Sequence, residues 1–159
     1  MTEILKLIER DGRLSAAQIA AMLGREQKEV EDVLAKCEEE KIILGYKALI
    51  DWDRVREDMV TAFIAVKISP QRGYGFDRIA ERIYQYDEVE SLYLMSGDFD
   101  LGVFMSGHSV KEVSTFVFGR LAPIEGVTST STHIILKKYK EKHCVFNAEP
   151  EQEERPLYI

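Results

Sequence analysis

The segment LYLMSGDFDLGVF, residues 92–104, decides how the second half of this chain folds. Two apolar runs of β-type residues, at 92–95 and 101–105, flank the pentapeptide SGDFD. This pattern predicts a hairpin, because the glycine accepts the positive φ that tight hairpin turns require. The turn gathers two carboxylates, a hydroxyl and main-chain N–H groups at one end of a sheet. Such a cluster is typical of a solvated turn, or of a site for a small zwitterion that needs donors for its carboxylate and acceptors for its ammonium.

Helix and strand patterns surround this hairpin on both sides. A β-type run at 59–68 and a helical repeat at 76–87 precede it, while a capped helix at 109–121 and a β-type run at 127–139 follow it. The order β-α-β-β-α-β predicts a ferredoxin-like α+β domain over residues 59–140. Helices cover only one face of such a sheet, so apolar strand residues on the other face predict a second chain as its cover.

Residues 1–50 carry helical patterns that predict a helix-turn-helix. Ser15 begins a capping box at the start of a short helix. Ala20, Gly24 and Val30 follow at the spacing of a helix-turn-helix. That motif needs a small residue where two helices nearly touch, a glycine at the turn and an apolar anchor on the second helix.

The remaining segments complete the predicted organisation. β-type residues at 41–50 predict a strand or small wing after the helices. We therefore expect a winged helix-turn-helix domain at 1–50, a charged linker at 51–58, the ferredoxin-like domain at 59–140 and a tail at 141–159. The tail is polar and acidic, and we expect it either to be solvated or to lie as an arm on a partner subunit.

The helix-turn-helix presents a surface of mixed charge for a DNA contact. The candidate DNA-binding residues are Ser15, Arg25, Gln27, Lys28, Glu31 and Lys36. Residues 1–50 contain 8 Lys and Arg against 10 Asp and Glu, a formal charge of −2. Neutralisation of phosphates supplies most non-specific affinity, so one such module should bind double-stranded DNA weakly and several must act together. Glu31 stays among the candidates because a carboxylate can accept a hydrogen bond from a cytosine amino group.

Composition narrows the class of protein. The 159 residues are 45% hydrophobic and carry a formal charge of −7, so no overall basic character indicates a nucleic-acid partner. Cys37 and Cys144 fit no metal-binding spacing, and we expect no metal and no cofactor. No apolar run approaches the roughly 20 residues that a membrane span needs. The charged helical start does not match a signal peptide, so we expect a cytoplasmic protein.

Both halves together resemble the Lrp/AsnC regulators, also called leucine-responsive or feast/famine proteins. The motifs that carry this resemblance are spread over residues 2–140. They are Ile4-Leu5 with Ile8, Leu14-Ser15 through Gly24, Val30 with Glu38, Ile42-Ile43 with Gly45-Tyr46, the hexapeptide at 96–101, and Gly126-Val127 with Thr130 and Thr132. One position departs from the family pattern, because Val33 stands where the recognition helix of the family usually carries Arg.

The resemblance implies a transcription regulator with a DNA-binding winged helix and an amino-acid-responsive domain. Such proteins form dimers that often assemble into octamers, with the effector at interfaces near the Gly-Asp turn. The candidate effector-binding residues are Gly97, Asp98, Phe99, Asp100, Thr130 and Thr132. Main-chain N–H groups around Gly97 and the two threonine hydroxyls would serve the effector carboxylate. Asp98 or Asp100 would accept from its ammonium, and Asp100 is favoured because a residue just beyond the turn can point back into the site, unless both carboxylates only cap the turn.

Two other classes of function remain open at this point. A ligand-sensing oligomer with weak or no DNA binding would fit the acidic second helix. An enzyme is the third possibility, because some sirohaem decarboxylases look like this family. The histidines available for catalysis are His108, His133 and His143. We find no nucleophile–base pair and no metal cluster in the sequence, so we expect no enzymatic activity.

Overall fold

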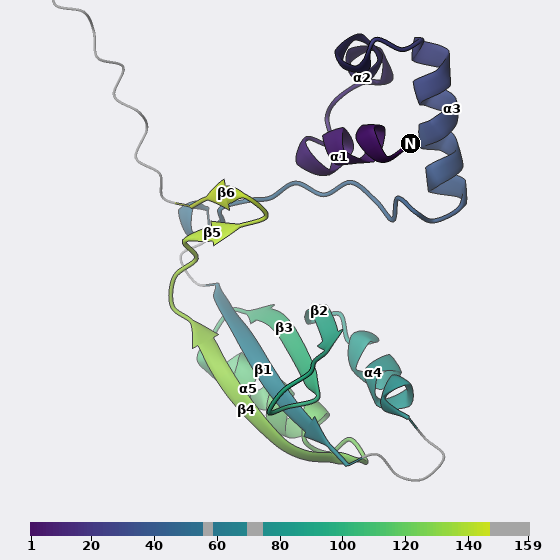
Figure 1. The fold of residues 1–159 in the computed structure, drawn as a ribbon. Helices are drawn as coiled ribbons and strands as arrows, with labels where there is room; N and C mark the ends of the chain where they lie inside the picture. The colour runs from purple at the N-terminus through teal and green to yellow at the C-terminus, as the bar shows by residue number, and fades with distance from the viewer. Residues whose placement is uncertain (56–58, 70–74, 147–159) are drawn as a thin grey trace, which may run out of the picture. The chain divides into compact units, whose positions relative to one another are not determined.

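The computed structural model describes residues 1–55, 59–69 and 75–146 (Figure 1). Contacts between Cα atoms divide the chain into two compact units, Met1–Ile50 and Asp51–Ile159. Linker residues 56–58 and tail residues 147–159 of the predicted organisation lie outside the described residues.

The first unit is a cluster of three helices, α1 (Thr2–Arg10), α2 (Ala16–Leu23) and α3 (Gln27–Glu39). Its buried core joins all three, with Ile4 from α1, Ile19 and Ala20 from α2, and Val30 from α3. Ala20 is 5% exposed, as expected for a small residue at a close helix crossing. The predicted helix-turn-helix is therefore formed.

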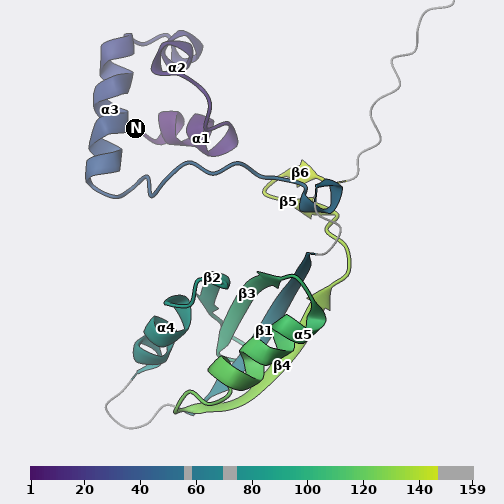
Figure 2. The ribbon, with the colours of Figure 1, turned by 180° about the vertical axis from the view of Figure 1, so that it is seen from behind.

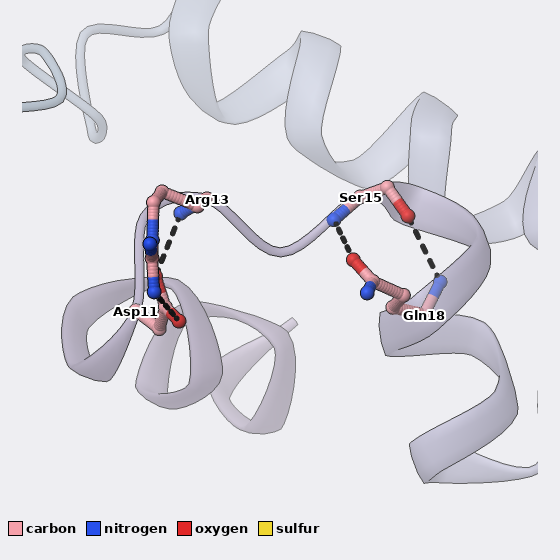
Figure 3. A network of polar contacts seen from close by, with 4 residues as sticks. All are labelled: Asp11, Arg13, Ser15 and Gln18. Atoms are coloured by element: carbon pink, nitrogen blue, oxygen red, sulfur yellow. Dashed lines mark hydrogen bonds and ion pairs between the residues drawn. The ribbon is translucent and has the colours of Figure 1, made fainter.

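Local signals in the sequence set the ends of α2. The Ser15 hydroxyl accepts from the Gln18 main-chain nitrogen at 3.2 Å, and the Gln18 side chain accepts from the Ser15 nitrogen at 2.9 Å (Figure 3). This capping box satisfies two donors that the first helical turn leaves free. Gly24 ends the helix with φ 62° and ψ 38°, a left-handed conformation that favours glycine.

The strand predicted within residues 41–50 is not formed in this chain. Residues 44–51 are neither helix nor strand. A strand needs a neighbour for its main-chain groups, and no described residue pairs with this segment. The segment instead packs locally: a Cβ added at Gly12 would lie 3.3 Å from the Tyr46 ring, and the Tyr46 hydroxyl donates to Glu38 at 2.9 Å.

The second unit contains the four-stranded antiparallel sheet of a ferredoxin-like fold. Its strands are β1 (Val60–Ile68), β2 (Val89–Leu94), β3 (Leu101–Gly107) and β4 (Val127–Ile135), in the spatial order β2-β3-β1-β4. The helices between them are α4 (Phe76–Tyr84) and α5 (Val110–Phe116), and α5 continues into one π-helical turn, Val117–Leu121. The predicted βαββαβ order is therefore confirmed.

The core of this unit lies between the sheet and the helices. Alternate residues of β1, from Ala62 to Ile68, and of β3, from Leu101 to Met105, point into it, and Ile83 and Leu121 meet them from the helical layer. Figure 2 shows α5 lying over the sheet on the side opposite to that seen in Figure 1. The other face of the sheet, defined here as the open face, is not covered by a described helix.

The last predicted strand is shorter than expected. β4 ends at Ile135 rather than at residue 139. A small hairpin of β5 (Lys140–Glu141) and β6 (Cys144–Val145) follows, with Lys142 and His143 as its loop. The sequence does not indicate this hairpin, because its loop contains no glycine, asparagine or proline.

Candidate functional site

The turn between β2 and β3 is held by main-chain hydrogen bonds on both sides. The Met95 nitrogen donates to the Asp100 carbonyl at 2.8 Å, and the Asp100 nitrogen donates to the Val66 carbonyl of β1 at 3.0 Å. Gly97 is exposed within this turn and has φ 146°, in the region that favours glycine. These hydrogen bonds hold the ends of the turn, while the main chain at Gly97 is exposed and a ligand can approach it closely.

The two aspartates of this turn have different surroundings. One carboxylate oxygen of half-buried Asp100 accepts from the Ile68 main-chain nitrogen at 2.7 Å, beside the irregular pairing at Lys67 and Ile68. Asp98 is exposed and has no hydrogen bond or ion pair with any described residue. Asp100 therefore ties the turn to β1, while the Asp98 carboxylate is available to a cation.

Phe99 connects the turn to the open face. Its ring centroid lies 5.6 Å from that of Phe63 in an edge-to-face contact, an arrangement that aromatic rings favour. The Phe63 ring also meets Phe104 at 5.0 Å and His133 at 5.9 Å. The ring of Tyr93 extends the row, 6.1 Å from Phe104. These five side chains form one aromatic cluster on the open face.

A glycine makes room for this cluster. Gly102 is buried in β3 next to Phe63, and a Cβ at Gly102 would lie 2.9 Å from the Phe63 ring. The Phe63 ring thus lies across the strand instead of pointing away from it. This arrangement leaves a wide apolar surface on a sheet that the described helices do not cover.

Thr130 and Thr132 lie away from the turn within one chain. They pair with Val66 and Ile64 of β1, whose side chains belong to the helical face. Strand β1 separates them from the β2–β3 hairpin, and two strand spacings amount to roughly 10 Å. The structure therefore brings Gly97, Asp98, Phe99 and Asp100 together and leaves the two threonines apart from them.

The candidate DNA-binding residues are largely engaged with acidic neighbours. Arg25 pairs with Glu3 of α1 at 2.8 Å and with Glu29 at 3.1 Å, so it joins two helices. Four further candidates lie on α3. Three of them contact a carboxylate, and the fourth, Glu31, carries one. The pairs are Gln27 with Glu31 at 2.7 Å, Lys28 with Asp32 at 2.9 Å and Lys36 with Glu40 at 3.7 Å.

These contacts change what α3 offers to an anion. The Asp32 carboxylate holds the pKa of Lys28 above its usual range, through a hydrogen bond first and its charge second. A phosphate must therefore compete with a carboxylate already at hydrogen-bond distance. Ser15 likewise uses its hydroxyl in the capping box of α2. To bind DNA, these side chains must therefore exchange their contacts with neighbouring residues of the protein for contacts with the duplex.

The histidines lie on separate elements and suggest no shared chemistry. His133 stacks on Phe63, and its Nε2 lies 3.3 Å from the Ser131 hydroxyl, while His108 and His143 are exposed. Among residues 1–55, 59–69 and 75–146, no group of three His, Cys, Asp or Glu side chains could hold a metal ion. No helix in the described part of the chain is long and apolar enough to cross a membrane.

The chain is similar to known proteins over most of its length. A family model described as "Lrp/AsnC ligand binding domain" matches residues 61–144. The "Uncharacterized HTH-type transcriptional regulator YugG" of Bacillus subtilis (strain 168) is 48% identical over 146 residues, which cover 91% of this chain and 88% of that relative. The "HTH-type transcriptional regulator FL11" of Pyrococcus horikoshii is 27% identical over 87% of this chain and 89% of its own length.

Solved structures agree on the fold. Escherichia coli AsnC superposes with a TM-score of 0.68 at 19% identity, covering 87% of this chain and 91% of its own. A feast or famine regulatory protein from M. tuberculosis, complexed with L-methionine, gives a TM-score of 0.72 at 22% identity and covers 88% of this chain and 92% of its own. These likenesses confirm the predicted fold class of a helix-turn-helix followed by a ferredoxin-like domain.

Proposed function

Because this chain belongs to the Lrp/AsnC family, we propose that it is a transcriptional regulator that binds double-stranded DNA and responds to an amino acid. Residues 1–50 contact DNA, and residues 59–140 bind the effector and join copies of the chain. The observation that carries this proposal is the helix-turn-helix itself, with Ala20 buried at the crossing and Gly24 left-handed at the turn.

The β2–β3 turn supports the effector part of the proposal. The main chain around Gly97 presents donors for a carboxylate, and the Asp98 carboxylate has no partner among the described residues and suits an ammonium. Asp100 holds the turn in place through Ile68. Within this proposal, Thr130 and Thr132 reach an effector only when it lies against a second subunit, because in one chain they are two strands away.

The aromatic cluster of the open face supports assembly. Four aromatic residues and His133 lie on one sheet face, and large apolar surfaces of this kind mark protein interfaces. A two-fold pair of sheets would bury the same patch on both subunits. We propose a homodimer through this face, which assembles further into an octamer and so presents several helix-turn-helix units to one duplex.

The acidic partners of α3 favour one alternative, a ligand-sensing oligomer with weak DNA binding. Lys28 and Lys36 are each paired with a carboxylate on their own helix. One measurement distinguishes the DNA-binding regulator from the ligand sensor. Fluorescence anisotropy with labelled duplexes drawn from the protein's own genome should give saturable binding of the regulator at low salt. A protein that shifts its melting temperature with an amino acid but binds no duplex would be the sensor alone.

A further inference from the structure

Positive charge in this chain is concentrated at one place outside the helix-turn-helix. Residues 137–145, named here the basic hairpin, contain four lysines and one glutamate, a formal charge of +3. The whole chain carries −7, so everything outside the basic hairpin amounts to −10. The basic hairpin is therefore a local region of attraction for anions on a protein that otherwise repels them.

The backbone of the hairpin is unusual at its tip. The two-residue loop places Lys142 at φ 45° and His143 at φ 69°, both left-handed. Tight loops of this kind strongly favour Asn-Gly, because most side chains are strained there. Residues in such conformations occur more often at functional sites than elsewhere. Here the left-handed backbone places a lysine and a histidine in the exposed loop that joins β5 and β6.

The lysines of the hairpin are largely free of carboxylates. Lys140 and Lys142 are exposed and form no ion pair with any described residue. The Lys137 ammonium lies 5.0 Å from the centre of the Tyr139 ring, and Lys138 alone pairs with an acid, Glu141, at 3.6 Å. On α3, by contrast, each lysine has a carboxylate partner. The hairpin thus offers the unpaired ammonium groups that the helix lacks.

We propose that the basic hairpin is a second DNA contact, which binds the phosphate backbone without regard to sequence. The proposal rests on the proposed function, because it assumes that the helix-turn-helix brings the chain to a duplex. Lysine is a flexible point charge that suits phosphate oxygens. Each phosphate that a lysine neutralises releases a counterion and steepens the salt dependence of binding by about 0.9. The hairpin would add affinity and leave sequence preference to α3.

The test uses the full chain with Lys140→Gln and Lys142→Gln together, and measures duplex binding by anisotropy between 50 and about 300 mM salt. Two variants serve as controls. Lys140→Arg with Lys142→Arg keeps the charge, and Lys111→Gln with Arg82→Gln removes the same charge from exposed helical positions of the same unit. Far-UV circular dichroism and thermal melting check that all variants are folded.

We expect the hairpin glutamine variant to show a salt slope shallower by about 1.8 for each hairpin on the duplex, and more than about tenfold weaker binding at 0.1 M salt. The arginine and helical controls should keep the wild-type slope. An unchanged slope in the glutamine variant, while substitutions on α3 weaken binding, would overturn the hairpin contact and leave the proposed function standing. A wild-type protein that binds no duplex at low salt would overturn both.

An anionic lipid surface is the competing partner, because Tyr139 and Val145 are 70% and 63% exposed beside the lysines. Vesicles of phosphatidylcholine with phosphatidylglycerol test it by co-sedimentation. We expect no binding, because a vesicle offers no site for the helix-turn-helix, and the lysines alone would have to overcome the charge of −10 on the rest of the chain. Lysine-dependent binding to vesicles together with an unchanged DNA slope would refute the proposal.

Discussion

The main-chain nitrogen of Ile68 donates a 2.7 Å hydrogen bond to the carboxylate of Asp100, 32 positions away in the sequence. This bond joins the end of β1 to the last residue of the turn, directly before β3. It gives the carboxylate of Asp100 a defined structural task. In the proposed function, the acceptor for a ligand ammonium is then the neighbouring carboxylate of Asp98. The two aspartates of the turn should therefore respond differently to mutation.

Asp100→Ala should lower the free energy of unfolding by about 1.5 kcal/mol, because the Ile68 nitrogen loses a charged acceptor. Urea denaturation of the free protein measures this loss. The matched control is Asp98→Ala at the exposed position of the same turn, which should cost less than about 0.5 kcal/mol. Equal losses in both variants would show that the hydrogen bond to Ile68 contributes nothing specific.

Asp98→Asn should abolish the rise in melting temperature that an amino acid effector produces. An effector at about 100 times its dissociation constant stabilises the native protein by roughly 2.7 kcal/mol, which a thermal-shift screen of the twenty amino acids detects. Glu90→Gln, at an exposed position of β2, is the control and should keep the response. A full response in the Asp98 variant would exclude this carboxylate as the ammonium acceptor.

Glu31→Gln combined with Asp32→Asn should strengthen non-specific DNA binding at low salt. The substitutions remove two negative charges from the exposed side of α3 and release Lys28 from its 2.9 Å pair with Asp32. Anisotropy with a duplex of arbitrary sequence measures the change. Glu81→Gln combined with Glu90→Gln changes the net charge equally in the second unit. If that control strengthens binding as much, the net charge of the protein governs affinity, and the location of the two charges on α3 does not matter.

Phe104→Glu should convert the assembled protein to a monomer. The substitution places a charge in the aromatic cluster, where a dimer would have to bury it without a partner. Size-exclusion chromatography with light scattering measures the mass. Phe118, which is 75% exposed on the π-helical turn, provides the control, because Phe118→Glu should keep at least the dimer. A wild-type protein that is monomeric at micromolar concentration would contradict assembly through the open face.

Tyr46→Phe should change how stability depends on alkaline pH. Partial burial, and then the hydrogen bond to Glu38, hold the pKa of Tyr46 above its usual value of 10.0. The folded state therefore favours the protonated phenol, and this stabilisation is complete below pH 10 and is lost as pH rises through the raised pKa. Urea denaturation from pH 9 to 11.5 should show a steeper decline for the wild type than for the phenylalanine variant. Parallel curves would mean that the pKa of Tyr46 is not raised in the folded protein.

The sequence was most informative where a local rule decides the structure. Ser15 with Gln18 predicts the start of α2 without reference to the rest of the chain, and Gly24 predicts its end. Such features depend on neighbours within four residues, so a single sequence contains all that is needed to predict them.

Features that depend on distant residues were not predictable. The bond between Asp100 and Ile68 requires the register of two strands, and no spacing rule provides it. Residues 41–50 have the composition of a strand, but a strand forms only where another one pairs with it. Two-residue hairpin loops strongly favour Asn-Gly and similar pairs. The Lys142-His143 loop contains none of these residues, so that preference does not predict it.

The two separate hydrophobic clusters have a consequence for how heat acts on this protein. The helical unit has a small core of its own, in which Ile4, Ile19 and Val30 are fully buried, and the sheet unit has a second and larger one. Each core can melt as its own cooperative transition, so calorimetry should resolve two heat-absorption peaks. An effector bound at the β2–β3 turn would move the peak of the sheet unit, and a duplex bound to α3 would move the peak of the helical unit. The melting profile would thus report which half of the chain holds a given ligand.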